Sequence, residues 1–223
     1  MGPILNIIST PIGNYKDVTF HAIEELKDSD FIIGEEFKET SKFLKHYGIT
    51  KEFELLNEHS TMENVMELIQ AIKRSKKVSL ISDSGTPLVE DPGSNLVEFA
   101  IQENIEIKMI PGASALLCAL VLSGFRISPF TFIGFFSQKE EIRKNEIKKY
   151  LMLNHTLVIY ETPYRYKKVI QEIQKFSKQN YKIFLGLNLT TPQEIQYRGT
   201  IREIIKVLDS FPKALPVIVL EKL

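Results

Sequence analysis

Short runs of apolar residues alternate with helix-forming stretches through the first half of this chain, and this alternation limits the possible folds more than any other feature. The apolar runs at residues 5–9, 31–34, 78–82 and 105–110 have the length and composition of buried strands. The stretches between them are amphipathic and predict helices that begin near Asp17 and cover residues 39–47, 60–72 and 94–102. Strands and helices that alternate in this way predict βαβ units and a mostly parallel sheet.

Local signals predict where two of these helices begin. Asp17 is a good N-cap for the first helix, whose apolar face carries Ala22 and Leu26. Residues 60–63, Ser-Thr-Met-Glu, have the form of a capping box. The helix behind this box is expected to bury Val65, Leu68, Ile69 and Ile72.

The pattern changes after Pro111 and Gly112. Residues 113–123 are nearly all apolar and predict a helix buried between two layers. Strands are expected at 130–135, 156–161, 182–189, 194–198 and 216–221, and helices at 140–152, 164–176 and 201–211, the last behind a capping box at 200–203. Only residues 190–193 separate the third and fourth of these strands, which is a hairpin length, so the second sheet should be mixed. We therefore predict two lobes, 1–112 and 113–223.

Composition excludes several classes of protein. Lys and Arg number 28 and so do Asp and Glu, and a net charge of zero argues against a protein that holds bare nucleic acid by charge alone. Basic clusters such as residues 143–149 are expected to be solvent-exposed helix surface. One cysteine and four widely spaced histidines predict no internal disulfide and no metal site. The apolar runs are too short to cross a membrane, so we expect a cytoplasmic protein.

Three loops at predicted strand ends are rich in Gly, Pro, Ser and Thr. They are residues 9–14, residues 82–87 continuing to 91–93, and residues 111–115. Ligands bind outside the carboxyl ends of parallel strands, so these loops are expected to line one cleft. The alternative is that glycine and proline only mark strand ends. Neither a dinucleotide fingerprint nor a P-loop is present, and the segment 112–115 would need an acid and a histidine in suitable places to serve as a hydrolase nucleophile elbow.

The three loops belong to a longer ordered set of motifs. With Phe132-Ile133-Gly134-Phe135, Tyr160-Glu161-Thr162-Pro163-Tyr164-Arg165 and Arg198-Gly199-Thr200, they follow the order and approximate spacing of the tetrapyrrole methylase superfamily. The resemblance covers essentially the whole chain. Within the superfamily, the sequence is most similar to the ribosomal RNA small-subunit methyltransferase I branch.

This resemblance implies a two-lobed α/β protein, usually a homodimer, that binds S-adenosylmethionine in a cleft between its lobes. The implied reaction is methylation of a cytidine ribose 2′-hydroxyl in small-subunit ribosomal RNA. Matching the motifs residue by residue implies that the cofactor-binding positions are Pro11, Asp83, Gly85, Thr86, Ser114, Ala115 and Phe135. Tyr160 and Arg165 match the segment that faces the substrate.

Methyl transfer to a hydroxyl also requires a group that accepts its proton. Glu36, beside Glu35 at the end of the second strand, and Glu161, beside Tyr160, are the candidate catalytic carboxylates. We expect Glu36→Gln and Glu161→Gln each to slow transfer without unfolding the protein. The alternative is that these glutamates bond loop amides or pair with Lys38 or Arg165. Asp83 likewise has two possible roles, as a cofactor ligand or as a cap of its own turn.

Two other functions stay open at this point. Residues 34–38, 162–165 and 187–191 depart from the ribosomal RNA branch, and the last of these lacks the charged groups usual there. The chain could instead methylate a tetrapyrrole or another small molecule. It could also bind the cofactor without catalysis and act as an assembly or regulatory partner.

Overall fold

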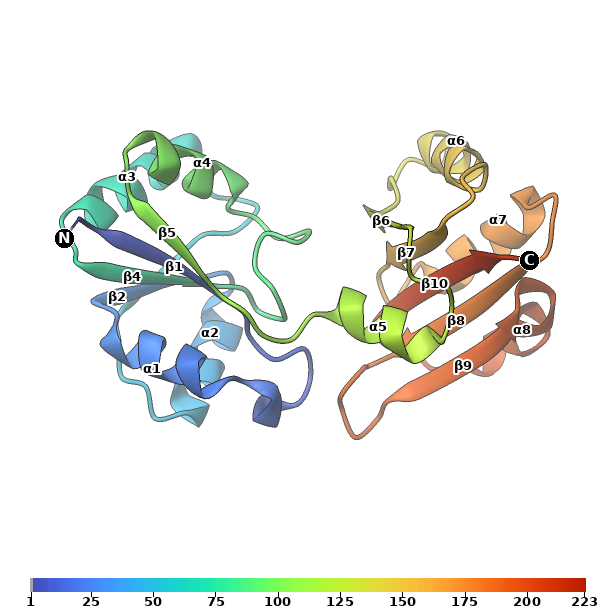
Figure 1. Cartoon of the computed structure of the whole chain (residues 1–223), viewed down its shortest axis with the longest axis horizontal. Helices are drawn as coiled ribbons and strands as arrows, with labels where there is room; N and C mark the ends of the chain where they lie inside the picture. The colour runs from blue at the N-terminus through green and yellow to red at the C-terminus, as the bar shows by residue number, and fades with distance from the viewer. Residues whose placement is uncertain (1) are drawn as a thin grey trace. The chain divides into compact units, whose positions relative to one another are not determined.

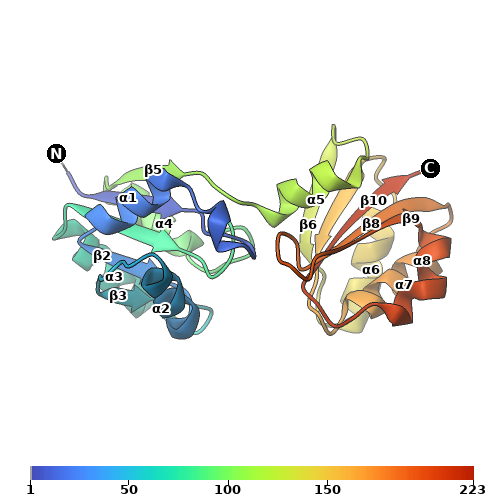
Figure 2. The ribbon, with the colours of Figure 1, turned by 90° about the horizontal axis from the view of Figure 1, so that it is seen from below.

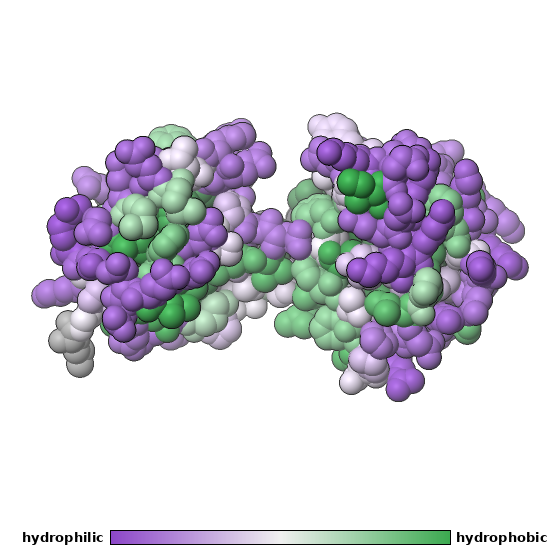
Figure 3. Space-filling model, turned by 90° about the horizontal axis from the view of Figure 1, so that it is seen from above, coloured by the Kyte–Doolittle hydropathy of each residue, from purple (hydrophilic) through white to green (hydrophobic). Residues whose placement is uncertain are grey.

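The computed structural model describes residues 2–223, which form two compact units that divide after Ser114. Each unit has a five-stranded sheet and hydrophobic clusters of its own. Figures 1 and 2 show the elements of each unit from two directions. On the face drawn in Figure 3, hydrophilic residues cover most of each unit and apolar patches interrupt them. Among the described residues, no helix has both the length and the hydrophobicity of a membrane span.

The first unit is built on a parallel sheet with the strand order β3-β2-β4-β1-β5. In this sheet β1 lies between β4 and β5, and its Ile8 lies beside Ile81 of β4 and Ile110 of β5. The carboxyl ends of these three strands therefore lie side by side, and the loops that follow them begin at one edge of the sheet. The strands are β1 (Ile4–Ile8), β2 (Phe31–Gly34), β3 (Phe53–Leu55), β4 (Lys77–Ile81) and β5 (Glu106–Ile110).

Helices cover both faces of this sheet, as Figure 1 shows. The clusters of buried residues place α1 and α2 on one face, through Leu26 and Phe43, and α3 and α4 on the other, through Ile69 and Leu96. The first unit therefore has three layers, with the sheet between two pairs of helices. The helices are α1 (Phe20–Asp28), α2 (Phe37–His46), α3 (Met62–Lys73) and α4 (Ser94–Gln102), and a short 3-10 helix, η1 (Tyr15–Asp17), precedes α1.

Two of the predicted helix caps were wrong by one or two residues. Asp17 lies in η1, and Thr19 caps α1 by accepting a hydrogen bond from the Ala22 N–H. The capping box of α3 pairs Thr61 with Asn64, one residue beyond the predicted box. The short strand β3 was not predicted, because its three residues are only half-buried or exposed and include Glu54.

The second unit has a mixed sheet with the order β6-β7-β10-β8-β9, as the hairpin-length connection at 190–193 predicts. Strands β6 and β7 are parallel, and the other neighbouring pairs are antiparallel. The strands are β6 (Phe130–Phe135), β7 (Thr156–Tyr160), β8 (Tyr181–Leu187), β9 (Ile195–Thr200) and β10 (Pro216–Lys222). The helices are α5 (Ala115–Ser123), α6 (Glu140–Tyr150), α7 (Tyr166–Phe176) and α8 (Ile201–Val207), followed by η2 (Leu208–Ser210).

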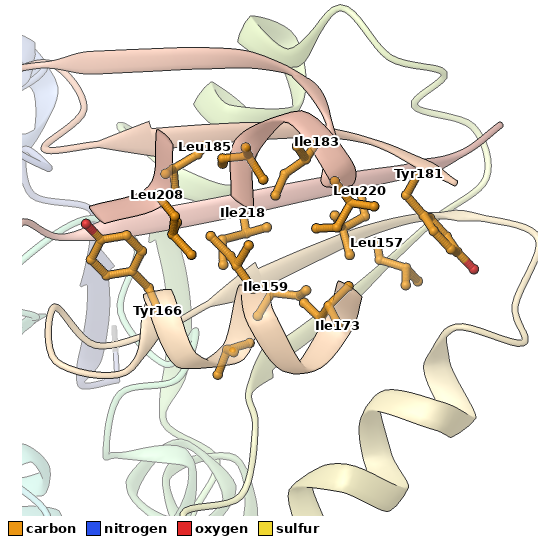
Figure 4. Packing of buried hydrophobic residues seen from close by; sticks show 14 of the residues in the cluster. Leu157, Ile159, Tyr166, Ile173, Tyr181, Ile183, Leu185, Leu208, Ile218 and Leu220 are labelled. Carbon is orange, nitrogen blue, oxygen red and sulfur yellow. The ribbon is translucent and has the colours of Figure 1, made fainter. Parts of the chain in front are cut away.

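The core of the second unit lies between its sheet and the helices α6, α7 and α8. Figure 4 shows Leu157, Ile159 and Ile218 of the sheet facing Ile173 of α7 and Leu208 of η2. Helix α5 packs against β8 and β10. Its predicted burial between two layers is wrong for the described residues, because Leu117 is 56% and Val121 is 73% exposed. Only Ala119, Leu120 and Ser123 of this helix are buried.

The basic segment at 143–149 contains one buried basic residue. Arg143 is 3% exposed, and its guanidinium donates to both carboxylate oxygens of Glu172 at 2.7 and 3.0 Å. Its third nitrogen donates to the carbonyl oxygens of Ser137 and Gln138. A buried bidentate pair of this kind fixes α6 against α7 and the loop before α6.

Arg143→Leu should lower the free energy of unfolding by about 3–5 kcal/mol, because it leaves the Glu172 carboxylate buried without its partner. The double variant Arg143→Leu/Glu172→Leu should lose less than this single variant. Chemical denaturation measures both, with Lys149→Leu as an exposed control from the same segment that should change stability by no more than about 0.5 kcal/mol. A single variant as stable as the control would contradict the assigned role of the pair.

Candidate active site

Hydrogen bonds join the loops that follow β1 and β4. The Thr10 N–H donates to the Gly85 carbonyl oxygen at 2.8 Å, and the Gly85 N–H donates to the Thr10 hydroxyl oxygen at 3.0 Å. The same hydroxyl donates to the Ser82 carbonyl oxygen at 3.1 Å. Thr10 is 2% exposed, so these bonds are protected from water. The two loops are therefore held in one fixed arrangement.

The loop after β5 joins the same arrangement through Thr86. The Thr86 hydroxyl donates to the Ala113 carbonyl oxygen at 3.2 Å, and the Ser9 hydroxyl lies 3.2 Å from the Thr86 hydroxyl oxygen. The Ser9 N–H donates to the Ile110 carbonyl oxygen at 3.1 Å. The three loops that the sequence singled out are thus bonded to one another within the first unit. We call residues 9–14, 82–87 and 111–114 the loop framework.

Two glycines let the backbones of the framework approach closely. Gly85 has a φ of +88°, a conformation that side chains disfavour. A Cβ atom on Gly112 would lie 2.9 Å from the Cβ of Ser9, which is closer than packed carbon atoms allow. Pro11 is buried beside them and fixes the path of the first loop. The framework therefore presents backbone polar groups at the sheet edge without bulky side chains.

Four carboxyl groups gather beside the framework. Glu35 and Glu36 follow β2, Asp83 follows β4 closely, and Asp91 lies farther along the chain after β4. The Glu36 N–H donates to Oδ1 of Asp83 at 3.2 Å, and the Asp83 N–H donates to Oε2 of Glu35 at 3.2 Å. Asp83 thus bonds across to the loop after β2. Oδ2 of Asp91 is buried and has no hydrogen-bond partner among the described residues.

Crowding of these acids changes their protonation. Burial, together with repulsion from Glu35 and Glu36, raises the pKa of Asp83 to about 6. Burial, together with repulsion from Glu35 and Asp83, raises the pKa of Asp91 to about 7. These two aspartates therefore titrate between about pH 6 and pH 7, and strongly shifted groups of this kind are typical of binding and catalytic sites.

The predicted site residues of the second unit lie around the end of β7. The Tyr160 hydroxyl oxygen accepts a hydrogen bond from the Leu116 N–H at 2.8 Å, which ties β7 to α5. The rings of Phe135 and Tyr160 are 6.0 Å apart in an edge-to-face arrangement. Ser114 and Ala115 are half-buried where the first unit ends and α5 begins.

Glu161 and Arg165 form a second bidentate ion pair. The Glu161 side chain is fully buried, and its two oxygens accept from Nε and Nη2 of Arg165, both at 2.9 Å. One of these oxygens also accepts from the Thr162 N–H at 2.7 Å, and Nη2 donates to the Phe136 carbonyl oxygen. This geometry favours the alternative in which Glu161 holds Arg165 in place.

Sequence reasoning named the three loops but missed the residues that hold them together. Thr10 and Ser9 are central to the framework, yet they were not among the predicted site residues. The available signal was a pair of hydroxyl residues directly after a buried strand. Asp91 was also missed, although it begins the segment 91–93 that continues the second loop. Among the described residues, no group of three metal-ligating side chains comes together.

Asp83→Asn and Asp91→Asn should each raise the melting temperature at pH 8 and raise it less at pH 5. Both carboxyls have a pKa in the folded chain above the ordinary value of 3.8, so their contribution to stability is complete only below pH 3.8 and is lost as pH rises from there to about 6 or 7. Thermal denaturation followed by circular dichroism from pH 5 to 8 tests this. The exposed Glu67→Gln is the control, and parallel profiles for all variants and the parent chain would refute the assignment.

Comparison with known proteins agrees with this architecture. The sequence profile of the Tetrapyrrole (Corrin/Porphyrin) Methylases matches residues 5–205. The chain is 43% identical over 221 residues to a "Ribosomal RNA small subunit methyltransferase I" of Leptospira borgpetersenii, covering 98% of this chain and 87% of that protein. A protein of the same name from Mycoplasmopsis pulmonis is 38% identical over 205 residues, covering 91% of this chain and 90% of that protein.

Solved structures show the same fold at low sequence identity. Diphthine synthase aligns with a TM-score of 0.76 at 17% identity, covering 98% of this chain and 89% of that one. Uroporphyrin-III C-methyl transferase of Thermus thermophilus, crystallised with S-adenyl homocysteine, aligns with a TM-score of 0.68 at 15% identity, covering 99% of this chain and 97% of that one. From the profile match and the identity to its relatives, the chain belongs to the tetrapyrrole methylase family and is an S-adenosylmethionine-dependent methyltransferase.

Proposed function

We propose that this methyltransferase acts on small-subunit ribosomal RNA and transfers the methyl group to a cytidine ribose 2′-hydroxyl. The observation that carries the proposal is the 43% identity, over 98% of the chain, to a relative named for small-subunit ribosomal RNA. The specific nucleoside and atom come from the motif resemblance described above. A net charge of zero agrees with an RNA substrate if local basic surface, and not total charge, provides the contact.

The loop framework suits S-adenosylmethionine, which has no phosphate and therefore needs no phosphate-binding loop. When bound, this cofactor supplies a methyl group on a positively charged sulfur. Backbone groups of the loops around Pro11, Gly85 and Thr86 would hold its adenosine and methionine parts, since small residues leave them accessible. Asp83 contributes a carboxylate close to these loops. Ser114, Ala115 and Phe135 are the further cofactor contacts that we propose.

Glu36 is the carboxylate that we assign to accept the hydroxyl proton. It lies at the N-cap of α2, its side chain is exposed, and it makes no capping hydrogen bond. An unengaged carboxylate beside the loop framework is free to meet a substrate hydroxyl. Glu161 has both oxygens committed to Arg165 and is therefore a positioning residue. Tyr160 and Arg165 are the residues that we assign to the substrate side.

Transfer of radiolabelled methyl groups to small ribosomal subunits tests the proposed function. The subunits are purified from a strain that lacks this protein, and the labelled RNA is digested with alkali. A 2′-O-methyl group blocks cleavage at its own nucleotide, so label in alkali-resistant dinucleotides supports the proposal. Label in mononucleotides points to a base, and label only in small molecules, or tight cofactor binding without transfer, rejects RNA as the substrate.

Gly112→Ala should weaken S-adenosylmethionine binding by about tenfold or more, which is about 1.4 kcal/mol, because the new methyl group would push the third loop away from Ser9. Isothermal titration calorimetry measures the dissociation constant. Ser9→Gly removes the contacted Cβ, so the double variant Ser9→Gly/Gly112→Ala should bind better than Gly112→Ala alone. Full affinity in Gly112→Ala would show that the close approach of these loops does not matter for the cofactor.

Glu36→Gln should lower the single-turnover rate of methyl transfer by about 100-fold with little change in stability, since general base catalysis typically contributes 10²–10⁴-fold. Glu161→Gln should instead lower the free energy of unfolding by about 3 kcal/mol and raise the KM for small subunits, because it releases Arg165. Exposed Glu98→Gln on α4 is the control. If Glu36→Gln keeps the parent rate, this residue is not the proton acceptor.

The predicted homodimer stays part of the proposal. Exposed apolar side chains on α5, Leu117 and Val121, are the kind of surface that self-association buries. Sedimentation equilibrium gives the mass in solution. A monomeric mass at micromolar concentration would contradict the proposed dimer.

A further inference from the structure

A groove of about 650 Å³ lies beside α2 on the first unit and has no role in the function proposed so far. It runs along one side of α2 and reaches η1. Its walls combine lysines with aromatic rings, a mixture that an ordinary solvent-exposed helix face does not require. The lining residues are Tyr15, Phe37, Lys38, Ser41, Lys42, Lys45 and His46.

The lysines of this groove follow helical spacing. Lys38, Lys42 and Lys45 are separated by four and three residues, so their ammonium groups project from one face of α2. Lys42 lies 3.6 Å from Glu39, whereas neither Lys38 nor Lys45 has a carboxylate within salt-bridge distance among residues 2–223. Three lysines and one nearby glutamate make this face a local positive surface, although the whole chain carries no net charge.

Aromatic rings form the rest of the groove. Tyr15 and His46 stack with their ring centres 4.4 Å apart and an angle of 21° between the rings. Lys42 Nζ lies 5.9 Å from the centre of the Tyr15 ring. Phe37 is 64% exposed and rests against Phe53, with the ring centres 5.3 Å apart. Burying an apolar ring is favourable, so an exposed and supported phenylalanine is suited to stack on a planar partner.

The groove begins where the loop after β2 ends. Phe37 directly follows Glu36, and the Glu36 N–H donates to Asp83 beside the loop framework. A chain of nucleotides in the groove would therefore pass close to the carboxylates at the end of β2. Lysines that contact phosphates and rings that stack on bases are the combination by which proteins bind single-stranded nucleic acid.

We propose that this groove binds a single-stranded segment of the RNA substrate, with Lys38, Lys42 and Lys45 contacting phosphates and Phe37 stacking on a base. The inference rests on the proposed function, because it takes the substrate to be RNA. It adds the surface that holds the strand. Unpaired bases are required for stacking, so the groove should prefer single-stranded to duplex RNA.

A second basic groove, on the other unit, offers a matched control. Its volume is about 410 Å³, and Lys148, Lys178 and Lys222 are among its lining residues. Lys148 Nζ lies 4.9 Å from the centre of the Phe176 ring and Lys175 Nζ lies 5.9 Å from it, so this ring is already covered by cations. Replacing these three lysines changes the net charge as much as replacing the three in the α2 groove.

The test is fluorescence anisotropy with a labelled 12-nucleotide oligouridine and, for comparison, an RNA duplex of the same length. One triple variant carries Lys38→Glu, Lys42→Glu and Lys45→Glu, and the control carries Lys148→Glu, Lys178→Glu and Lys222→Glu. The first should bind the single strand at least tenfold more weakly than the control. The slope of its log Kd against the logarithm of the salt concentration should be smaller by about 2 than that of the parent chain. Phe37→Ala should weaken binding by about tenfold. Circular dichroism and cofactor calorimetry verify that the variants are folded.

Equal losses in the two triple variants would mean that only overall charge matters, and they would overturn the groove. Unchanged affinity in the α2 triple variant and Phe37→Ala, or a parent chain that does not bind the oligouridine at low salt, would also overturn it. Preference for the duplex would do the same. If the groove variants lose RNA binding while the parent chain fails to methylate small subunits, the groove stands and the proposed function falls. If the parent chain methylates small subunits while the groove variants keep their RNA affinity, the proposed function stands and the groove falls.

Discussion

The reciprocal hydrogen bonds between Thr10 and Gly85 are the interaction on which the site in the first unit depends. Parallel pairing of β1 with β4 and β5 brings three loops to one edge, but it does not fix their shape. A buried threonine that bonds both backbone groups of Gly85, with Ser9 and Thr86 carrying the link to Ala113, converts three adjacent loops into a rigid framework. Rigid placement of backbone polar groups is what a ligand without phosphates needs.

Carboxyl groups crowd together beside the loop framework at a cost in stability. Burial raises the pKa of Asp83 and of Asp91, and repulsion from Glu35 adds to the rise for both aspartates. A folded protein without a ligand gains nothing from this crowding. Raised carboxyl pKa values of this kind are typical of binding and catalytic sites.

Prediction from sequence succeeded where local pattern and burial agree. The strands at 31–34 and 130–135 and the helix at 94–102 have the predicted bounds. The apolar pattern and the turn residues beside it mark the same boundaries there. Prediction failed where two residues close together in the sequence are equally good helix caps. Thr19 displaced Asp17 and Thr61 displaced Ser60, since the position of the helix against the sheet decides which side chain meets a free N–H. Arg143 looked like exposed surface, and only α7 supplies the Glu172 that makes its burial possible.

The sequence by itself determined the α/β class, the change from a parallel to a mixed sheet, and the loops of the site, because hydrophobic period and turn composition are local properties of the chain. Only the tertiary structure decided what the individual side chains do. It joined Thr10 to Gly85 across 75 residues, paired Glu161 with Arg165, and left Glu36 without a capping hydrogen bond. It also placed Lys38, Lys42 and Lys45 around one groove with Tyr15. Such pairings depend on which strands become neighbours, and strand order is a property of the folded chain that no local pattern encodes.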